Sequence, residues 1–306
     1  MRKTCLDMIY ELAKKDSRIV FIGSDLGAGT LKQFQEEIPE RFFMEGISEA
    51  NVVGMAAGFA MEGKIPYVNT ISSFITRRSF EQIVLDVCLH NLKVRLIGNG
   101  GGLVYAPLGP THMTVEDIAI MRAIPNMSVV AVADSYEMKK FMPQTVDYSG
   151  PIYIRLAKGY DPLITNNKIP FKIGKAIPMR EGKDILIITT GITLKLALEC
   201  AVEAKSKGIE ISVLHMPTIK PLDTDSILEY AKKVSLIIVI EEHSIIGGLG
   251  SAIAEVIAEA NFCQQIKYKR IGISDMFPDE YGSQASLMER FKITKEHLVQ
   301  TIHDMF

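Results

Sequence analysis

Short apolar runs alternate with helix-length amphipathic segments along the whole chain, and this alternation restricts the fold more than any other feature. In the first half, strand-like runs rich in β-branched residues cover 19–22, 66–71, 94–97, 129–132 and 152–156. Helical patterns accompany them at 4–14, 48–62, 79–90, 114–122 and 135–145. Strands that alternate with helices predict a mostly parallel sheet covered by helices on both faces. The expected fold class is therefore α/β, in three layers.

A second series of the same kind follows a break in the pattern. From about residue 160 the sequence is rich in Pro, Asn and Gly and loses its periodicity, which is typical of a connection between domains. Beyond it, predicted strands at 184–189, 209–214, 235–241 and 268–271 alternate with predicted helices at 193–207, 223–232 and 248–260. A chain of 306 residues also exceeds what one core usually organises. We predict two successive α/β domains, 1–162 and the smaller 183–306, joined by a linker at 163–182.

Composition and charge exclude several classes of function. The formal charge is −2 and the Lys and Arg residues are scattered, so the clustered basic surface of a nucleic-acid-binding protein is not expected. The longest apolar runs fall well short of the roughly 18 residues that a membrane-spanning helix needs. The four cysteines and six histidines show no metal-ligand spacing, and the first residues do not resemble a signal peptide. We expect a soluble cytoplasmic protein with free thiols and no metal ligands of its own.

The predicted helix at 48–62 is unusually poor in bulky side chains. Its small residues are Gly54, Ala56, Ala57, Gly58 and Ala60. They are a costly choice for a free surface helix, because each glycine lowers helix stability by about 1 kcal/mol, and they would let a partner backbone approach closely. Glu49 stands in the first turn, where the helix dipole favours an ionised carboxylate. Glu49 is either a functional acid or an ordinary first-turn acid beside a packed helix.

Two further segments are candidates for binding a ligand or moving a proton. The glycine-rich Gly98-Asn-Gly-Gly-Gly-Leu103 fits neither of the usual phosphate-binding patterns, so it is either an anion-binding loop or a turn that needs positive φ angles. His112 stands just before a predicted helix, whose start we place at Thr114 because Thr114-Val-Glu-Asp117 has the spacing of a capping box. This histidine is either a proton shuttle or a hydrogen-bonded turn residue.

Five segments, in this order and spacing, resemble the transketolase family of thiamine-diphosphate enzymes over essentially the whole chain. They are Gly46-Ile-Ser-Glu49-Ala-Asn-Val-Val-Gly-Met-Ala-Ala-Gly58, Phe74-Ile-Thr-Arg-Arg78, Gly109-Pro-Thr-His112, Met121-Arg-Ala-Ile-Pro-Asn126 and Glu241-Glu-His-Ser-Ile-Ile-Gly-Gly-Leu-Gly250. The resemblance implies a pyrimidine-binding domain followed by a transketolase C-terminal domain. We find no segment that resembles the diphosphate-binding half of the family. We therefore expect the C-terminal subunit of a split transketolase, paired in an α2β2 assembly with an N-terminal subunit that holds the diphosphate and Mg²⁺ or Ca²⁺.

The resemblance also implies which residues bind the cofactor. In the family a buried carboxylate pairs with a ring nitrogen of the pyrimidine, and Glu49 matches that catalytic carboxylate. Pairing with the ring can offset the cost of burying the acid. Phe74 matches an aromatic residue of the pyrimidine pocket, whereas two other aromatic positions are Val68 and Ile71 in this chain, so weaker stacking is expected. Asp25 matches an acid at the edge of the cofactor.

The positions that match the family's substrate pocket depart from its pattern. His112 matches a histidine that contacts the ketose hydroxyls and relays protons. A second histidine is replaced by Gly100, and an acid that reads a substrate hydroxyl is replaced by Leu108. Each lost hydrogen bond changes the discrimination between substrates with and without the matching hydroxyl by about 1–3 kcal/mol. The resemblance therefore implies the same cofactor chemistry with an altered substrate.

Arginines that bind the sugar phosphate in the family are only partly matched. Arg2 matches one of them, and the place of its partner falls on Lys158 or, in a shifted register, on Arg155. We expect transfer of a two-carbon ketol unit from a ketose to an aldehyde, with a sugar other than the usual pentose phosphates. The Gly98–Gly102 loop is expected to leave room for a bulkier substrate.

Three other functions stay open. A synthase that condenses pyruvate with an aldehyde, like deoxyxylulose-phosphate synthase, and the β subunit of a 2-oxo-acid dehydrogenase share these two domains. The Thr76–Arg78 and Arg122–Asn126 segments favour transketolase over both. A non-catalytic partner subunit would explain the altered pocket, but the presence of Glu49 and His112 argues against it. In addition, Glu241–Gly250 is either part of a ligand site or a connection that only packs the dimer.

Overall fold

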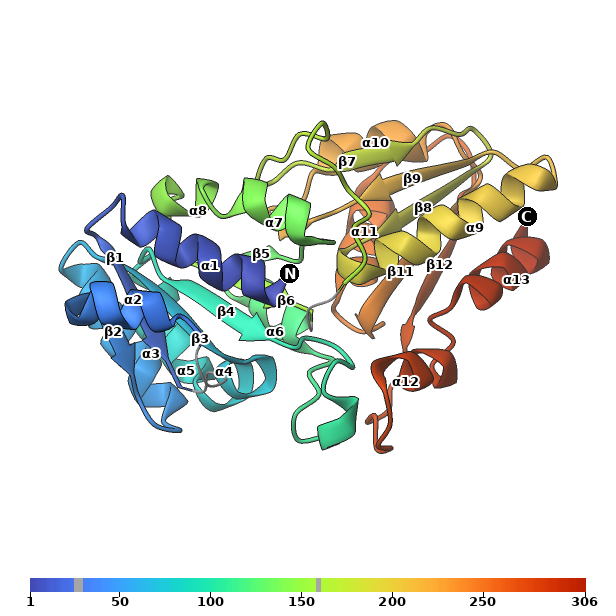
Figure 1. Ribbon diagram of the computed structural model, residues 1–306. Coiled ribbons are helices and arrows are strands. Elements are labelled where there is room, and N and C mark those ends of the chain that lie inside the picture. Colours follow the sequence, from blue (N-terminus) through green and yellow to red (C-terminus); the bar gives the residue numbers. More distant parts are fainter. Residues whose placement is uncertain (25–29, 158–160) are drawn as a thin grey trace.

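The computed structural model describes residues 1–24, 30–157 and 161–306, so the predicted site residues Asp25 and Lys158 lie outside the described residues. Two α/β domains follow each other along the chain (Figure 1). Each domain has a central, mostly parallel sheet with helices on both faces, which confirms the expected fold class.

The first sheet has seven strands in the described part of the chain, in the spatial order β10-β5-β6-β4-β3-β1-β2. Their bounds are β1 (Ile19–Gly23), β2 (Phe42–Met44), β3 (Ile65–Ile71), β4 (Arg95–Asn99), β5 (Ser128–Val130), β6 (Ile152–Leu156) and β10 (Thr218–Lys220). Neighbouring strands are parallel except for β10, which pairs antiparallel with β5. The strands β1, β3, β4 and β6 are buried along their whole length, because helices cover both faces of this sheet.

Helices on the two faces of the first sheet bury different core clusters (Figure 1). On one face lie α1 (Arg2–Ala13), α2 (Lys32–Glu37) and α7 (Ser135–Phe141); on the other lie α3 (Glu49–Met61), α4 (Ser72–Arg78) and α6 (Asp117–Ala123). Shorter segments are η1 (Pro39–Arg41), α5 (Phe80–Gln82), the π-helical η2 (Ile83–Cys88), η3 (Ala106–Leu108) and α8 (Gln144–Asp147). The helix predicted at 79–90 is therefore α5 followed by η2.

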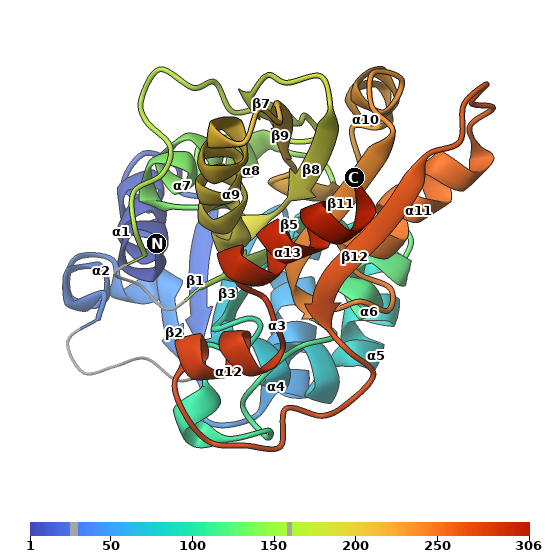
Figure 2. The same ribbon diagram turned by 90° about the vertical axis from the view of Figure 1, so that its right-hand side faces the viewer.

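The second sheet has the order β12-β11-β8-β9-β7 in the described residues, with β7 as an antiparallel edge strand. Its strands are β7 (Ile177–Arg180), β8 (Ile185–Thr189), β9 (Ile211–His215), β11 (Leu236–Ser244) and β12 (Lys267–Ile273). The helical segments of this domain are η4 (Gly191–Thr193), α9 (Leu194–Ser206), α10 (Thr224–Ala231), α11 (Leu249–Glu259), α12 (Gln284–Arg290) and α13 (Lys295–Met305). One face of the sheet packs against α9, α12 and α13, and the other packs against α10 and α11. Figure 2 shows α12 at the lower edge of this domain, beside the loop that contains η3.

Two strands depart from the predicted organisation. The strand β7 lies inside the predicted linker 163–182, and only Ile177 of its residues is buried, so its apolar pattern is too weak to mark a strand. The strand β10 belongs by sequence to the second domain but completes the first sheet. It has three residues, and its pairing partner β5 lies about 90 positions earlier in the chain. The two domains are consequently joined by a shared sheet as well as by a linker.

The helix predicted to begin at Thr114 begins instead at Asp117, so the predicted capping box is wrong. Thr114 pairs with Gly102 in an isolated antiparallel bridge, with its backbone N–H and C=O both hydrogen-bonded to Gly102. This pairing holds Thr114 in an extended conformation, and its hydroxyl has no hydrogen-bond partner among the described residues. A contact between loops has therefore overridden the local capping signal.

None of the helices in the described ranges combines the length and the apolarity that crossing a bilayer requires.

Candidate active site

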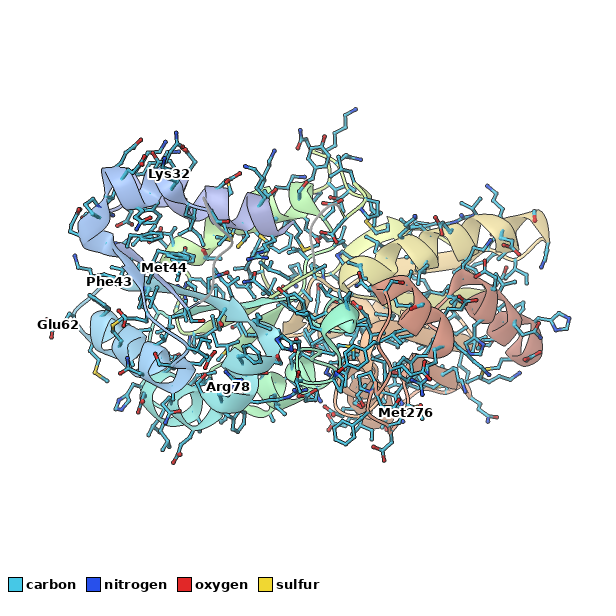
Figure 3. The ribbon with its side chains drawn as sticks, turned by 60° about the horizontal axis from the view of Figure 1, so that its bottom comes forward. Lys32, Phe43, Met44, Glu62, Arg78 and Met276 are labelled. Carbon is cyan, nitrogen blue, oxygen red and sulfur yellow. The ribbon has the colours of Figure 1, made fainter. Side chains whose placement is uncertain are left out.

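Glu49 begins α3, and its side chain is buried, with 4% of its surface exposed. Arg78 contacts this carboxylate from α4, where its Nη1 donates to both oxygens at 3.3 Å. A buried carboxylate requires such compensation, because removing its charge from water is costly. Arg78 is half-exposed, so the pair joins the interior of the first domain to its surface. Figure 3, which brings the bottom of Figure 1 forward, shows Arg78 on this side of the molecule.

Phe74 lies one helical turn before Arg78 on α4, and this spacing places the guanidinium over the aromatic ring, 3.9 Å from its centroid. The imidazole of His112 approaches the same ring edge-on, with the two centroids 5.1 Å apart. The structure thus brings Glu49, Phe74 and His112 together from three separate segments. The sequence analysis assigned no role to Arg78. Its position four residues after Phe74 on a helix would have predicted that the two side chains are neighbours.

The two aliphatic positions expected beside Phe74 differ in the structure. Ile71 is the last residue of β3 and lies at the edge of the site, directly before α4. Val68 is fully buried in the core cluster that the sheet shares with α3. The expectation that Val68 lines a cofactor pocket is therefore corrected: its side chain packs in the core beneath the site.

Several buried polar atoms gather at the carboxyl ends of β3 and β4. Ser73 Oγ, Asn69 Nδ2 and Asn99 Oδ1 have no hydrogen-bond partner within the described residues. Buried polar atoms are seldom left unpaired, and ligands of open α/β sheets bind at this end of the strands. A buried carboxylate beside an aromatic ring, with unpaired polar atoms at the same end of the strands, has the chemistry that a planar, nitrogen-containing ring such as an aminopyrimidine requires.

The loop from Gly100 to His112 corrects one expectation about the substrate. Gly100 has a φ of 70°, and the ring of Tyr105 fills the place where its side chain would project. The loop therefore does not leave room there for a bulkier substrate. Tyr105 also faces His112 edge-on, with the ring centroids 6.4 Å apart. Leu108 is half-exposed on η3.

The two expected phosphate-binding residues that the structure describes differ in their surroundings. Arg2 lies half-buried at the start of α1. Arg155 is buried inside the protein, where its Nε donates to Asp117 Oδ2 and its Nη2 donates to the backbone oxygen of Glu242, both at 2.8 Å. Because its guanidinium is engaged with the interior, Arg155 is corrected from a substrate-binding residue to a structural one.

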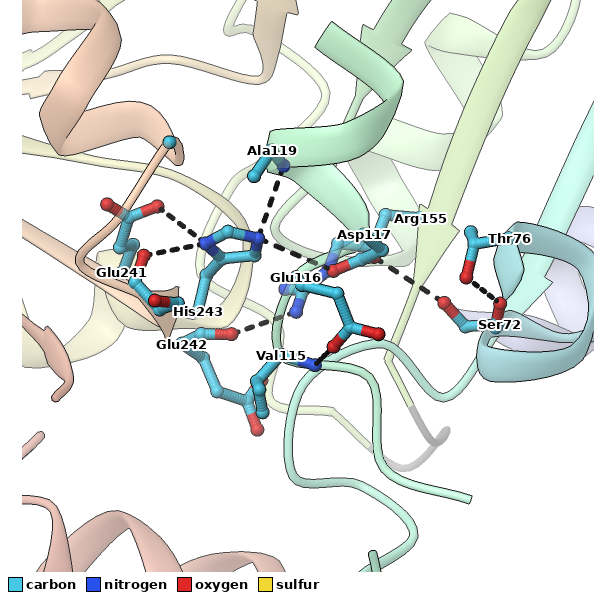
Figure 4. A network of polar contacts seen from close by, with 12 residues as sticks. Ser72, Thr76, Val115, Glu116, Asp117, Ala119, Arg155, Glu241, Glu242 and His243 are labelled. Carbon is cyan, nitrogen blue, oxygen red and sulfur yellow. Dashed lines mark hydrogen bonds and ion pairs between the residues drawn. The ribbon is translucent and has the colours of Figure 1, made fainter. Parts of the chain in front are cut away.

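Asp117 is the centre of a buried polar network between the two domains (Figure 4). Its Oδ2 accepts hydrogen bonds from Tyr153 and Arg155, and Ser72 Oγ lies 3.5 Å away. His243 Nε2 lies 3.9 Å from the other carboxylate oxygen of Asp117. Ser72 is the first residue of α4, so this network reaches the helix that carries Phe74.

The second domain contributes Glu241, Glu242 and His243 to this buried region. Glu241 accepts hydrogen bonds from the backbone N–H groups of Leu249 and Gly250 at the start of α11. Burial raises the pKa of Glu242, although Arg155 and hydrogen bonds to its carboxylate act in the opposite direction. The Glu241–Gly250 segment contacts the first domain through the backbone oxygen of Glu242, which accepts from Arg155, and through His243 Nε2, which accepts the backbone N–H of Ala119. Within the described ranges, no group of three His, Cys, Asp or Glu side chains could hold a metal ion.

Comparison with known proteins identifies the family of both domains. Residues 1–160 match the family described as transketolase, pyrimidine binding domain, and residues 174–298 match transketolase, C-terminal domain. The chain belongs to the transketolase family. This confirms the resemblance, and the strand-end cluster lies within the matched pyrimidine-binding domain.

Relatives of this transketolase-family chain include separate subunits of nearly its own length. A 6-deoxy-6-sulfo-D-fructose transketolase subunit from Clostridium sp. (strain MSTE9) is 38% identical and covers 100% of this chain and 94% of its own. An apulose-4-phosphate transketolase subunit from Phocaeicola vulgatus is 34% identical, with 98% and 95% covered. A solved split gene transketolase, described as an inactive beta4 tetramer, has a TM-score of 0.89 at 33% identity and covers 99% and 96%. The chain is homologous to subunits of split transketolases.

Proposed function

We propose that this chain is the C-terminal subunit of a split transketolase that moves a two-carbon ketol unit from a ketose to an aldehyde with thiamine diphosphate. The observation that carries the proposal is the buried carboxylate of Glu49, which shares one cluster with Phe74 and His112. The homology to separate transketolase subunits supports the same activity.

Each residue of the cluster has a chemical task in this proposal. Thiamine diphosphate, when bound, supplies the carbon nucleophile that takes up the two-carbon unit. Glu49 would hold a proton between its carboxylate and a ring nitrogen, which also offsets the cost of burying the acid. Phe74 and Ile71 would bind the ring through apolar contact. His112 would contact substrate hydroxyls and move a proton.

A second polypeptide completes the proposed enzyme. An N-terminal subunit would hold the diphosphate and Mg²⁺ or Ca²⁺, in a cytoplasmic α2β2 assembly. The exposed surface of α3 supports this arrangement, because Gly58 has no neighbouring atom within 4 Å of the place of a side chain and a partner backbone can approach it closely.

The substrate we propose is a modified sugar with fewer hydroxyl contacts than the usual pentose phosphates. Leu108 offers no polar side chain where the resemblance implies an acid, and at Gly100 the ring of Tyr105 takes the place of a histidine side chain, so fewer hydrogen bonds to sugar hydroxyls are expected. Each missing hydrogen bond changes the discrimination between sugars by about 1–3 kcal/mol. The two named relatives are described as acting on a sulfonated and on a phosphorylated sugar. A substrate panel should therefore include both kinds of anionic group.

The test is reconstitution with an N-terminal transketolase subunit, followed by mass analysis of the products from a panel of ketoses and aldehydes. Glu49→Gln should lower the rate by about 10²–10⁴-fold with the fold retained, because a positioned proton-transfer group contributes that much. Glu62→Gln makes the same chemical change at the exposed far end of α3 and should leave the rate within about twofold of wild type.

Four outcomes would contradict the proposal. Full activity of Glu49→Gln removes the catalytic role of the carboxylate. Consumption of pyruvate with release of carbon dioxide favours a synthase of the deoxyxylulose-phosphate type, and acyl transfer to a lipoyl domain favours a 2-oxo-acid dehydrogenase. Calorimetry that detects no binding of thiamine diphosphate to the two-subunit complex favours a non-catalytic subunit.

A further inference from the structure

The loop that presents His112 packs on the core of the second domain. Leu103, Ala106 and Met113 are buried, and they belong to the apolar cluster formed by β8, β11, α9 and α12, whereas Val104 packs in a core cluster of the first sheet. The loop starts at the carboxyl end of β4 in the first domain. Its conformation therefore depends on side chains that the second domain supplies.

Polar contacts from the second domain fix the beginning of this loop. Glu242 Oε1 accepts the backbone N–H of Leu103 at 2.9 Å and also the side-chain amide of Gln284 at 2.8 Å. Gly102 has a φ of 73°, and a side chain there would collide with the Glu242 carboxylate, because an ideal Cβ lies 2.6 Å from its Cδ. One carboxylate thus ties the loop to α12.

The end of the loop is held by an aromatic ring. Tyr281 lies in the segment between β12 and α12, and an ideal Cβ on Gly109 would lie 2.7 Å from its Cε1. The ring therefore rests directly on the backbone of Gly109. The carbonyl of Gly109 accepts the backbone N–H of His112 at 3.1 Å, and this bond closes the turn that presents the imidazole to Phe74.

From these contacts we propose that Tyr281 is a positioning residue for the reaction. By resting on Gly109 it fixes the turn that presents His112, so that the second domain takes part in substrate discrimination. The role of His112 in this inference rests on the proposed function, whereas the contact between Tyr281 and Gly109 does not. Tyr281 itself is largely exposed, at 71%, so removing its ring empties no core.

Three variants separate positioning from folding. Tyr281→Ala removes the ring, Tyr281→Phe keeps it, and Phe277→Ala removes another aromatic side chain, 81% exposed, from the same segment. Hydrogen exchange of the full chain alone, read on peptides covering 104–114, should accelerate in Tyr281→Ala only. Equal exchange in Tyr281→Ala and wild type, at equal melting temperature, would overturn the proposal.

Kinetics of the reconstituted complex test the consequence for the reaction. Tyr281→Ala should lower kcat/KM by about 10–100-fold, the effect expected when a catalytic group is displaced by about 1 Å. It should also change the pH profile of kcat/KM and the ratio of kcat/KM between two sugar substrates. Tyr281→Phe and Phe277→Ala should match wild type. An unchanged pH profile and sugar ratio in Tyr281→Ala would overturn the inference, as would full activity of His112→Ala. A wild-type complex without ketol transfer would refute the proposed function instead, while the exchange experiment still decides the contact.

Discussion

Removing the carboxylate of Asp117 should show how strongly the buried network stabilises the fold. Asp117 is fully buried, and its Oδ2 accepts hydrogen bonds from Tyr153 and Arg155, each at 2.8 Å. The Asp117→Ala variant leaves the Arg155 guanidinium in the same place, with 8% of its side chain exposed, and without this counter-charge. Breaking a buried pair from one side costs about 3–5 kcal/mol. For a chain of this size we expect the melting temperature to fall by about 5–15 °C.

The matched control is Asp147→Ala. Asp147 is 86% exposed and lies 3.3 Å from Arg18, and an exposed pair of this kind contributes at most about 1 kcal/mol. Urea unfolding followed by circular dichroism would measure both variants. The double variant Asp117→Ala/Arg155→Met removes both charges and should recover part of the loss, since the guanidinium is then absent. The reasoning about this pair is refuted if the free energy of unfolding of Asp117→Ala lies within about 1 kcal/mol of the wild-type value. It is also refuted if the double variant is less stable than the single one.

Two further predictions concern thiols and acid. A thiol reagent should label Cys263 alone in the native chain, because burial raises the pKa of the other three thiols to about 12. All four thiols should react in urea. Rapid labelling of more than one thiol in the native chain would contradict this prediction. Burial acts to raise the pKa of Asp134, but hydrogen bonds from Ile164, Thr165 and Glu137 outweigh it and lower this pKa. Its contribution to stability is therefore present above the pKa of the unfolded chain, near 4, and is lost as the pH falls through the lower folded value. Asp134→Asn should flatten the acid dependence of the unfolding free energy, and an unchanged dependence would show that Asp134 does not cause it.

The alternation of strands and helices was sufficient to predict two α/β domains, because a sheet buried on both faces leaves a strong apolar signal. Ile19–Gly23 and Ile185–Thr189 show this signal and are buried throughout. The strand β7 lacks it, since it is an edge strand and most of its residues are at least partly exposed. Thr114 was misread because a pairing with Gly102 replaced the local cap.

The family resemblance, and not the periodicity, selected residues that lie together in the structure. Glu49, Phe74 and His112 were predicted from matching segments, and the structure brings them together. Sequence spacing could not reveal that Arg155 is directed into the interior, because its partners Asp117 and Glu242 lie 38 and 87 residues away. Contacts between segments distant in sequence are those that a single sequence leaves undetermined.

The antiparallel pairing of Thr218–Lys220 with Ser128–Val130 bears on how this subunit can be re-engineered. A chimera cut at the linker would pair the recipient's β5 with the donor's β10, and a poor match would leave the backbone of Val129 and Val130 open to another chain. Such bare edges promote aggregation. An exchange of second domains between relatives therefore has to transplant a β10 that suits the recipient's β5.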